Sequence, residues 1–127
     1  KAFSFAYTID PTSVPLNWYT GNANAALGMY DKAKSDFLQA LRFAPFNRNV
    51  LNDLASSYAM NKNTDLAKKY YEEAARISPR FDDPKLNLAA LYIQEGNFKM
   101  AQQWLDLIFH DSERRTQYRE YIQQNSK

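Results

Sequence analysis

Residues 28–45, GMYDKAKSDFLQALRFAP, and residues 62–79, KNTDLAKKYYEEAARISP, are two versions of one pattern. Both stretches end in proline, and Pro11 lies one further step of 34 residues towards the N-terminus. Self-similarity at a fixed period of this length is the sequence signature of a repeat architecture, in which each unit stacks on its neighbours. The sequence therefore predicts a stack of repeats.

Other positions recur in the same register and say what each unit looks like. Small residues at helical spacing predict that two helices approach closely, and aromatic residues beside them fill the remaining space. Glycine between two helical stretches predicts a turn. The matching positions are Ala6, Ala40 and Ala74; Phe3, Phe37 and Tyr71; Ile9, Phe43 and Ile77; Ala33, Ala67 and Ala101; Gly28 and Gly96; and Tyr30 and Phe98.

Start and stop signals divide each unit into two helices. The first unit predicts helices over residues 15–27 and 30–43, with Thr12 or Ser13 as the N-terminal cap of the first. The second unit predicts a helix from a cap at Asn47 or Asn49 to about residue 60, and a partner over residues 64–77. Its turn at residues 61–63 lacks glycine, and we expect asparagine to supply the left-handed geometry there.

The third unit is expected to begin with Asp82 and Asp83 as caps and with Pro84 near the first helical position. A following helix, over residues 112–124, carries a narrow apolar stripe of Tyr118, Tyr121 and Ile122, which predicts a cap on the end of the stack. The expected packing residues of the third unit are Leu88, Ala89, Tyr92, Phe98, Ala101, Leu105 and Ile108.

The 34-residue period, with small residues at the helix crossing and a proline after the second helix, resembles the tetratricopeptide repeat family. The resemblance covers almost the whole chain. It implies an all-α fold, an antiparallel helix-pair solenoid forming a superhelix, with about three repeats and a C-terminal capping helix. We expect a single domain, residues 1–127, cut from a longer protein that supplies at least one more helix at the N-terminal end. Its expected parts are the end of a preceding repeat (1–11), repeats over 14–47, 48–81 and 82–110, and the capping helix (112–124).

Composition excludes several classes of function. The 16 basic and 14 acidic residues give a formal net charge of +2, which does not favour nucleic acid as a partner. The chain has no cysteine, and therefore no thiolate zinc site and no cysteine nucleophile. No apolar run reaches the length of a membrane span. We predict no cofactor, no metal and no membrane insertion by this chain; compartment and oligomeric state stay open.

Catalytic groups are sparse, and we predict that this chain is not an enzyme. The single histidine, His110, is expected at a helix end beside the last carbonyl groups. The neighbouring carboxylates Asp82 and Asp83, and Glu72 and Glu73, do not make an acid and base couple, because adjacent residues on a helix point apart. The pair Arg114 and Arg115 is expected on a solvated face, with anion binding at a helix start as the alternative.

The family resemblance implies that the first helix of each repeat lines a concave inner face. This face would be rich in amides and nearly uncharged, and it implies a groove for a peptide or protein partner. Trp18 would be an apolar anchor, and the asparagines would bond to the ligand backbone. Trp18, Asp83 and Asn87 stand where related domains that grip a chaperone's terminal carboxylate have cations, which disfavours that function. The expected inner-face residues are Trp18, Tyr19, Asn22, Ala26, Asn52, Asp53, Ser56, Leu86, Asn87 and Gln94.

Two alternatives to a protein-interaction scaffold remain. Residues 9–28, IDPTSVPLNWYTGNANAALG, and 44–55, APFNRNVLNDLA, also resemble repeats that follow the membrane portion of bacterial O-antigen ligase or polymerase proteins. That resemblance implies a parent attached to a bacterial inner membrane, which assembles lipopolysaccharide or surface polysaccharide with a catalytic centre outside these residues. The other alternative is direct binding of a sugar or lipid by Trp18 and Tyr19.

Overall fold

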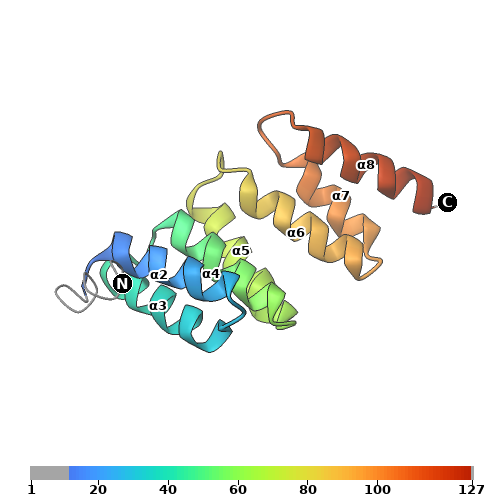
Figure 1. Ribbon diagram of the computed structural model, residues 1–127. Helices are drawn as coiled ribbons and strands as arrows, with labels where there is room; N and C mark the ends of the chain where they lie inside the picture. Colours follow the sequence, from blue (N-terminus) through green and yellow to red (C-terminus); the bar gives the residue numbers. More distant parts are fainter. Residues whose placement is uncertain (1–11, 127) are drawn as a thin grey trace.

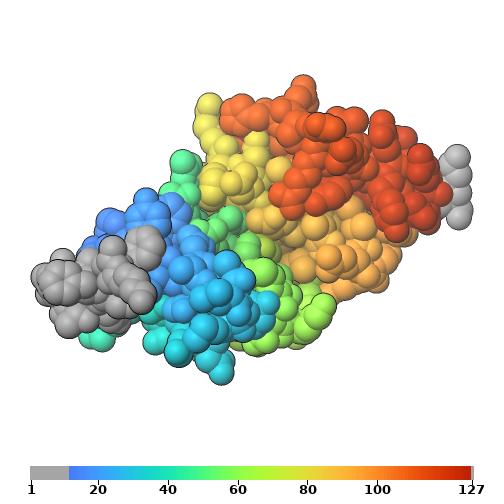
Figure 2. All heavy atoms as spheres, viewed as in Figure 1, coloured from blue at the N-terminus to red at the C-terminus, as the bar shows by residue number. Residues whose placement is uncertain are grey.

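The structure is a computed structural model that describes residues 12–126. Within this range the chain forms seven α-helices and no strands, so the all-α expectation is confirmed. The expected end of a preceding repeat, residues 1–11 with Pro11, lies outside the described residues. The helices follow one another along a long molecule, from α2 at one end to α8 at the other (Figures 1 and 2). They are α2 (Val14–Ala26), α3 (Tyr30–Phe43), α4 (Arg48–Met60), α5 (Thr64–Ile77), α6 (Asp83–Gln94), α7 (Phe98–Asp106) and α8 (Glu113–Asn125).

The helices pack as pairs, α2 with α3, α4 with α5 and α6 with α7, and each pair stacks on the next. The first helices of neighbouring pairs also approach each other, α2 to α4 and α4 to α6. Among the helices of residues 12–126, the second helices α3, α5 and α7 make no such approach to one another. The stack is therefore curved, with the first helices on its inner side and the second helices spread apart on its outer side.

Close packing within each pair depends on alanine. Ala33, Ala67 and Ala101 have no exposed surface, and neither do Ala40 and Ala74. A methyl side chain lets two helix backbones come together where a larger one would hold them apart. The alanines that the sequence analysis placed at the crossings are thus buried there.

The helix caps are the ones that the side-chain chemistry favours. Ser13, rather than Thr12, accepts a hydrogen bond from Leu16 N at 3.3 Å. Asn47 accepts from Asn49 N at 3.0 Å and from Val50 N at 3.2 Å, so that Asn49 is inside the helix. Bonds of this kind satisfy the backbone N–H groups that an isolated helix start leaves without partners.

Asp82 does not cap α6 as expected. It occupies the N-cap position without a side-chain capping bond, and its carboxylate instead accepts from Phe109 N, His110 N and the His110 ring, each at 2.9 Å. His110 therefore meets a carboxylate and not the helix-end carbonyls that we predicted. Burial acts to raise the pKa of Asp82, but these three hydrogen bonds outweigh it and hold the pKa below its ordinary value. The carboxylate ties the connection between α7 and α8 to the start of the third repeat.

The last helix covers the end of the stack. Ile122 is buried together with Leu105 and Ile108, with Tyr118 packed against them. Tyr121 is half exposed and meets the edge of the Phe98 ring at 6.2 Å between centroids. Two of the three residues of the predicted stripe thus reach the core, while the third rests at its margin.

Gly21 marks a contact that the sequence analysis did not identify. Phe37 is completely buried, and a Cβ at Gly21 would lie 2.6 Å from its ring. One period further on, the same two positions hold Ala55 and Tyr71, and two periods on they hold Ala89 and Leu105. In each repeat, a small residue of the first helix is therefore paired with a large residue of the second helix, and the smallest residue, Gly21, faces the ring of Phe37.

We predict that Gly21→Ala lowers the free energy of unfolding by about 1–3 kcal/mol, because the added methyl group overpacks the Phe37 ring. This loss exceeds the ~1 kcal/mol that alanine contributes to helix propensity. The combination with Phe37→Leu, which reproduces the third repeat, should be more stable than Gly21→Ala alone. Urea unfolding measures both; a stabilising Gly21→Ala would contradict the contact.

The glycine-free turn between α4 and α5 is made by lysine. Lys62 has φ +67°, where the corresponding Gly28 and Gly96 have φ +77° and +78°. Our expectation that asparagine would supply this geometry is wrong. The repeat register determines which residue is left-handed. Asn63 N donates to Tyr58 O at 2.9 Å, as Met29 N donates to Asn24 O at the corresponding turn of the first repeat. Position 62 then takes the left-handed conformation whatever residue stands there.

Lys62→Gly should therefore raise the free energy of unfolding by about 0.5–1 kcal/mol, since it removes a left-handed residue with a side chain. Asn63→Gly is the control, because Asn63 has a negative φ of −93°, and it should give no gain. Thermal or urea unfolding of the three proteins makes the comparison. Equal effects of the two glycines would count against this explanation.

Candidate binding face

The inner side of the curve is lined by the first helices and by α8, and polar side chains link them in a row. Trp18 Nε1 donates to Asp53 Oδ2 at 2.6 Å, and Asn22 Nδ2 donates to the same oxygen at 3.2 Å. These bonds join α2 to α4. A charged acceptor makes such bonds stronger than neutral ones.

The row continues from α4 to α8. Asn87 Nδ2 donates to Asn52 Oδ1 at 3.1 Å, and Arg114 donates to Asn87 Oδ1 at 2.8 Å. The guanidinium also donates to Tyr118 Oη at 2.8 Å. Arg114 thus belongs to the inner face, whereas Arg115 pairs with Asp111. Our expectation of a solvated face is wrong for both residues, because α8 packs on α6 and α7. Arg114 turns towards Asn87, and the Arg115 side chain is only 16% exposed.

A second-helix residue also reaches the row. The hydroxyl of Tyr71 on α5 lies 2.7 Å from Ser56 Oγ on α4. Burial raises the pKa of Tyr71 and outweighs the hydrogen bond with Ser56 and the charge of Arg114, which act to lower it. The phenol therefore stays neutral, and able to donate, at any pH that the folded protein meets in a cell.

The predicted inner-face residues fall into three groups. Six of them bond to a side chain of another helix: Trp18, Asn22, Asn52, Asp53, Ser56 and Asn87. Tyr19, Ala26 and Gln94 are exposed. Leu86 is buried in the core with Ala89, Leu105 and Ile122 of the capping helix, so the expectation that its side chain lines an open inner face is wrong.

Tyr19 is the large apolar side chain that this face presents to solvent. It is 53% exposed and stacks on Trp18 with ring centroids 5.8 Å apart. Trp18 itself is partly buried and packs on the core of the first repeat. On this face Tyr19, stacked on the partly buried Trp18, is the more exposed of the two rings.

The described residues bring no three histidine, cysteine, aspartate or glutamate side chains together in the way that a metal ion needs. None of the helices in residues 12–126 combines the length and the apolar character required to cross a bilayer.

Asp53 is the acceptor on which the junction of the first two repeats depends. We predict that Asp53→Ala lowers the free energy of unfolding by about 1–2 kcal/mol, because the Trp18 and Asn22 donors lose their acceptor in a partly buried site. Asp65→Ala, at an exposed position of α5, should change it by less than ~0.5 kcal/mol. Urea unfolding measures both, and equal effects would show that the junction does not depend on this carboxylate.

The comparisons with known proteins agree with this geometry. Family models described as tetratricopeptide repeat match residues 58–121 and residues 21–47. The two matches together extend from the first helix to the last, and the first alone spans half of the chain.

Solved structures of similar shape include a tetratricopeptide repeat protein from Parabacteroides merdae, with a TM-score of 0.84 and 22% identity over 98% of this chain. This chain spans 51% of that protein. The Sgt2 TPR domain from Aspergillus fumigatus matches with a TM-score of 0.79 and 22% identity, over 87% of this chain and 77% of that one. The first TPR of Spaghetti (RPAP3), bound to the HSP90 peptide SRMEEVD, has a TM-score of 0.79 and 17% identity, over 87% and 90%. At these identities the likeness shows a shared fold, the helix-pair solenoid.

Proposed function

Because this chain belongs to the tetratricopeptide repeat family, whose helix pairs are protein-interaction scaffolds, we propose that its concave face binds an extended segment of a partner protein. The binding residues would be Tyr19, Asn52, Asp53 and Gln94, with Arg114 at the C-terminal end of the face. The bonded side chains Trp18, Asn22, Ser56 and Asn87 would hold these groups in place. The module itself would be non-catalytic.

The observation that carries this proposal is the hydrogen-bonding capacity left over in the polar row. The two bonds to Asp53 both go to Oδ2, so its Oδ1 has no donor among the described residues. Asn52 uses its carbonyl oxygen for Asn87, and its amide group has no acceptor among them. One acceptor and one donor thus stand on neighbouring residues of α4, which suits the N–H and C=O of a peptide backbone.

The internal bonds favour binding. Side chains that are already held in place lose little conformational freedom when a ligand arrives, so less of the interaction energy is spent on ordering them. Tyr19 adds a large, rigid contact at the N-terminal end of the face, of the kind that dominates many interfaces. The Spaghetti domain, which has this fold, is bound to an HSP90 peptide, and this supports a peptide ligand.

Peptides selected from a phage-displayed library with the wild-type protein would test the site. We expect Tyr19→Ser to weaken their binding roughly tenfold, and Gln94→Ala to weaken it by a smaller factor. Leu38→Ser is the control, because Leu38 is 40% exposed on the outer helix α3, and it should leave affinity unchanged. Fluorescence anisotropy gives the dissociation constants. Ligands that respond to Leu38→Ser and not to Tyr19→Ser would place binding elsewhere.

The O-antigen ligase parent and the sugar or lipid ligand stay predictions from the sequence. No contact among residues 12–126 favours either of them over a polypeptide ligand.

A further inference from the structure

The outer side of the curve carries two equivalent grooves, one at each junction between repeats. The first lies against α3 and α5 and has a volume of about 290 Å³; the second lies between α5 and α7 and has about 500 Å³. Corresponding positions line both, 34 residues apart in the sequence. They are Leu41 and Ala75, Pro45 and Pro79, Leu51 and Lys85, Tyr70 and Trp104, and Glu73 and Leu107.

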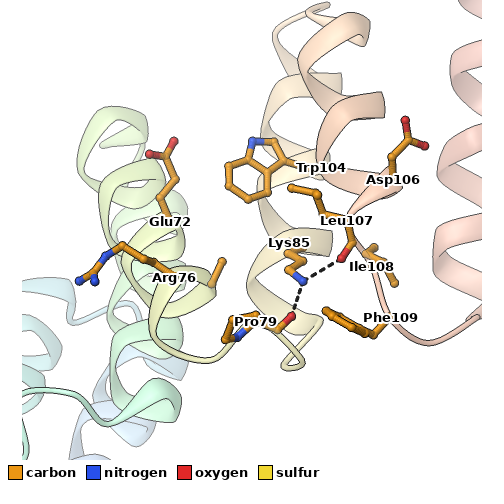
Figure 3. Close-up of a pocket in the computed structure, with 10 residues that line it drawn as sticks. Glu72, Arg76, Pro79, Lys85, Trp104, Asp106, Leu107, Ile108 and Phe109 are labelled. Atoms are coloured by element: carbon orange, nitrogen blue, oxygen red, sulfur yellow. Dashed lines mark hydrogen bonds between the residues drawn. The ribbon is translucent and has the colours of Figure 1, made fainter.

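The second groove is larger for reasons visible in the sequence. Leu41 partly fills the first groove, and at the same place Ala75 has a single methyl group. The helix that forms the far wall is also shorter, since α7 has 9 residues where α5 has 14. The chain after α7 then brings Phe109 to the edge of the groove (Figure 3). The two grooves therefore form an internal comparison within one molecule.

Lys85 puts a positive charge on the floor of the larger groove. Its ammonium donates to Leu107 O at 2.8 Å and to Pro79 O (Figure 3), and the residue is only 4% exposed. These bonds occupy two of its three N–H groups. The Phe109 ring lies 4.8 Å away, and no carboxylate among the described residues forms an ion pair with Lys85. The corresponding residue of the first groove, Leu51, is apolar.

The walls above this charge are apolar. Trp104 on α7 faces α5 across the groove, with Leu107 near it (Figure 3), and Ala75 of α5 also lines the groove. Glu72, Arg76 and Asp106 stand at the rim, so the rim has mixed charge and the floor is positive. An anion that binds the Lys85 ammonium must therefore be small enough to pass the rim. The rest of that ligand must be apolar, because it would contact Trp104.

We propose that the groove between α5 and α7 is a ligand site for a small apolar carboxylic acid. The carboxylate would accept the remaining N–H of Lys85, a charge-assisted bond in an apolar setting. The ring or alkyl body would lie against Trp104 and Ala75. The volume falls within the range of small-molecule pockets in proteins. This site is on the opposite side of the repeats from the concave face, and its ligand is independent of the partner proposed there.

The two tryptophans of the chain make a direct test, because one lies in each site. With 4-phenylbutyrate as the probe, we expect a saturable shift of the Trp104 indole N–H resonance in a two-dimensional proton–nitrogen spectrum. The Trp18 resonance should not move. The neutral 4-phenylbutyramide should bind at least about fivefold more weakly, since it lacks the charge. Equal binding of the acid and the amide, or a shift of Trp18 alone, would overturn the proposal.

Two variants test the groove itself. Ala75→Leu imitates the first groove and should abolish the Trp104 shift without touching Lys85. Lys85→Met replaces the ammonium with a neutral, unbranched side chain one atom shorter and should remove the preference for the acid over the amide. Lys69→Met is the matched control, because Lys69 lines the first groove, and it should leave binding unchanged. Thermal unfolding verifies that each variant is folded.

The result would also separate this proposal from others. If a peptide ending in phenylalanine with a free carboxylate shifts Trp104 while 4-phenylbutyrate does not, the ligand is a polypeptide terminus and the small-acid proposal fails. Undiminished binding in Ala75→Leu also overturns it. Neither outcome affects the concave face, which Trp18 and the selected peptides report.

Discussion

The structure depends on the close approach of two helices at alanine residues. Ala33, Ala67 and Ala101 are fully buried at the three pair crossings, and a larger side chain there would push the helices apart and change the angle at which the next pair stacks. The curve of the stack follows from this packing together with the contacts between first helices. A curved stack necessarily has an inner side where helices are close and an outer side where they separate. Both proposed sites are consequences of that difference.

On the inner side, the same hydrogen bonds stabilise the stack and shape the proposed binding surface. The hydrogen bonds from Trp18 to Asp53 and from Asn87 to Asn52 cross from one repeat to the next, so each contributes to the junction as well as to the surface. Such bonds contribute about 1 kcal/mol each. This is a substantial part of the marginal free energy of unfolding of a small domain. Residues of this kind cannot be exchanged without loosening the junction, whereas Gln94 is exposed and makes no such bond among the described residues.

Much of the fold could be predicted from the sequence because the period repeats local signals three times. The alanines, the prolines Pro45 and Pro79 after the second helices of the first two repeats, and the helix starts at Tyr30 and Thr64 are local, and they recur. The site was harder, because its bonds link residues 35 or 27 positions apart. The local sequence around Arg114 predicts a solvated residue, because it does not show that α8 turns this side chain towards Asn87. At Lys62 a local preference gave the wrong prediction. The repeat register requires a left-handed residue at position 62, and the preference of asparagine for that conformation did not determine its position.

The two junctions between repeats differ at corresponding positions, and these differences change what each junction must stabilise. Leu51 needs no compensation when it is buried, but Lys85 at the same position loses the hydration of its charge, and burial lowers its pKa, opposed in part by Asp82. The carbonyl groups of Pro79 and Leu107, near the C-terminal ends of α5 and α7, offset part of that cost, because helix C-termini favour cations. Capping two helix ends explains the lysine by itself. It does not explain why Ala75 replaces Leu41 across the same groove, which gives up apolar packing that the first junction keeps. A charge on the floor and space above it arise from two separate substitutions, and a ligand that needs both accounts for them together.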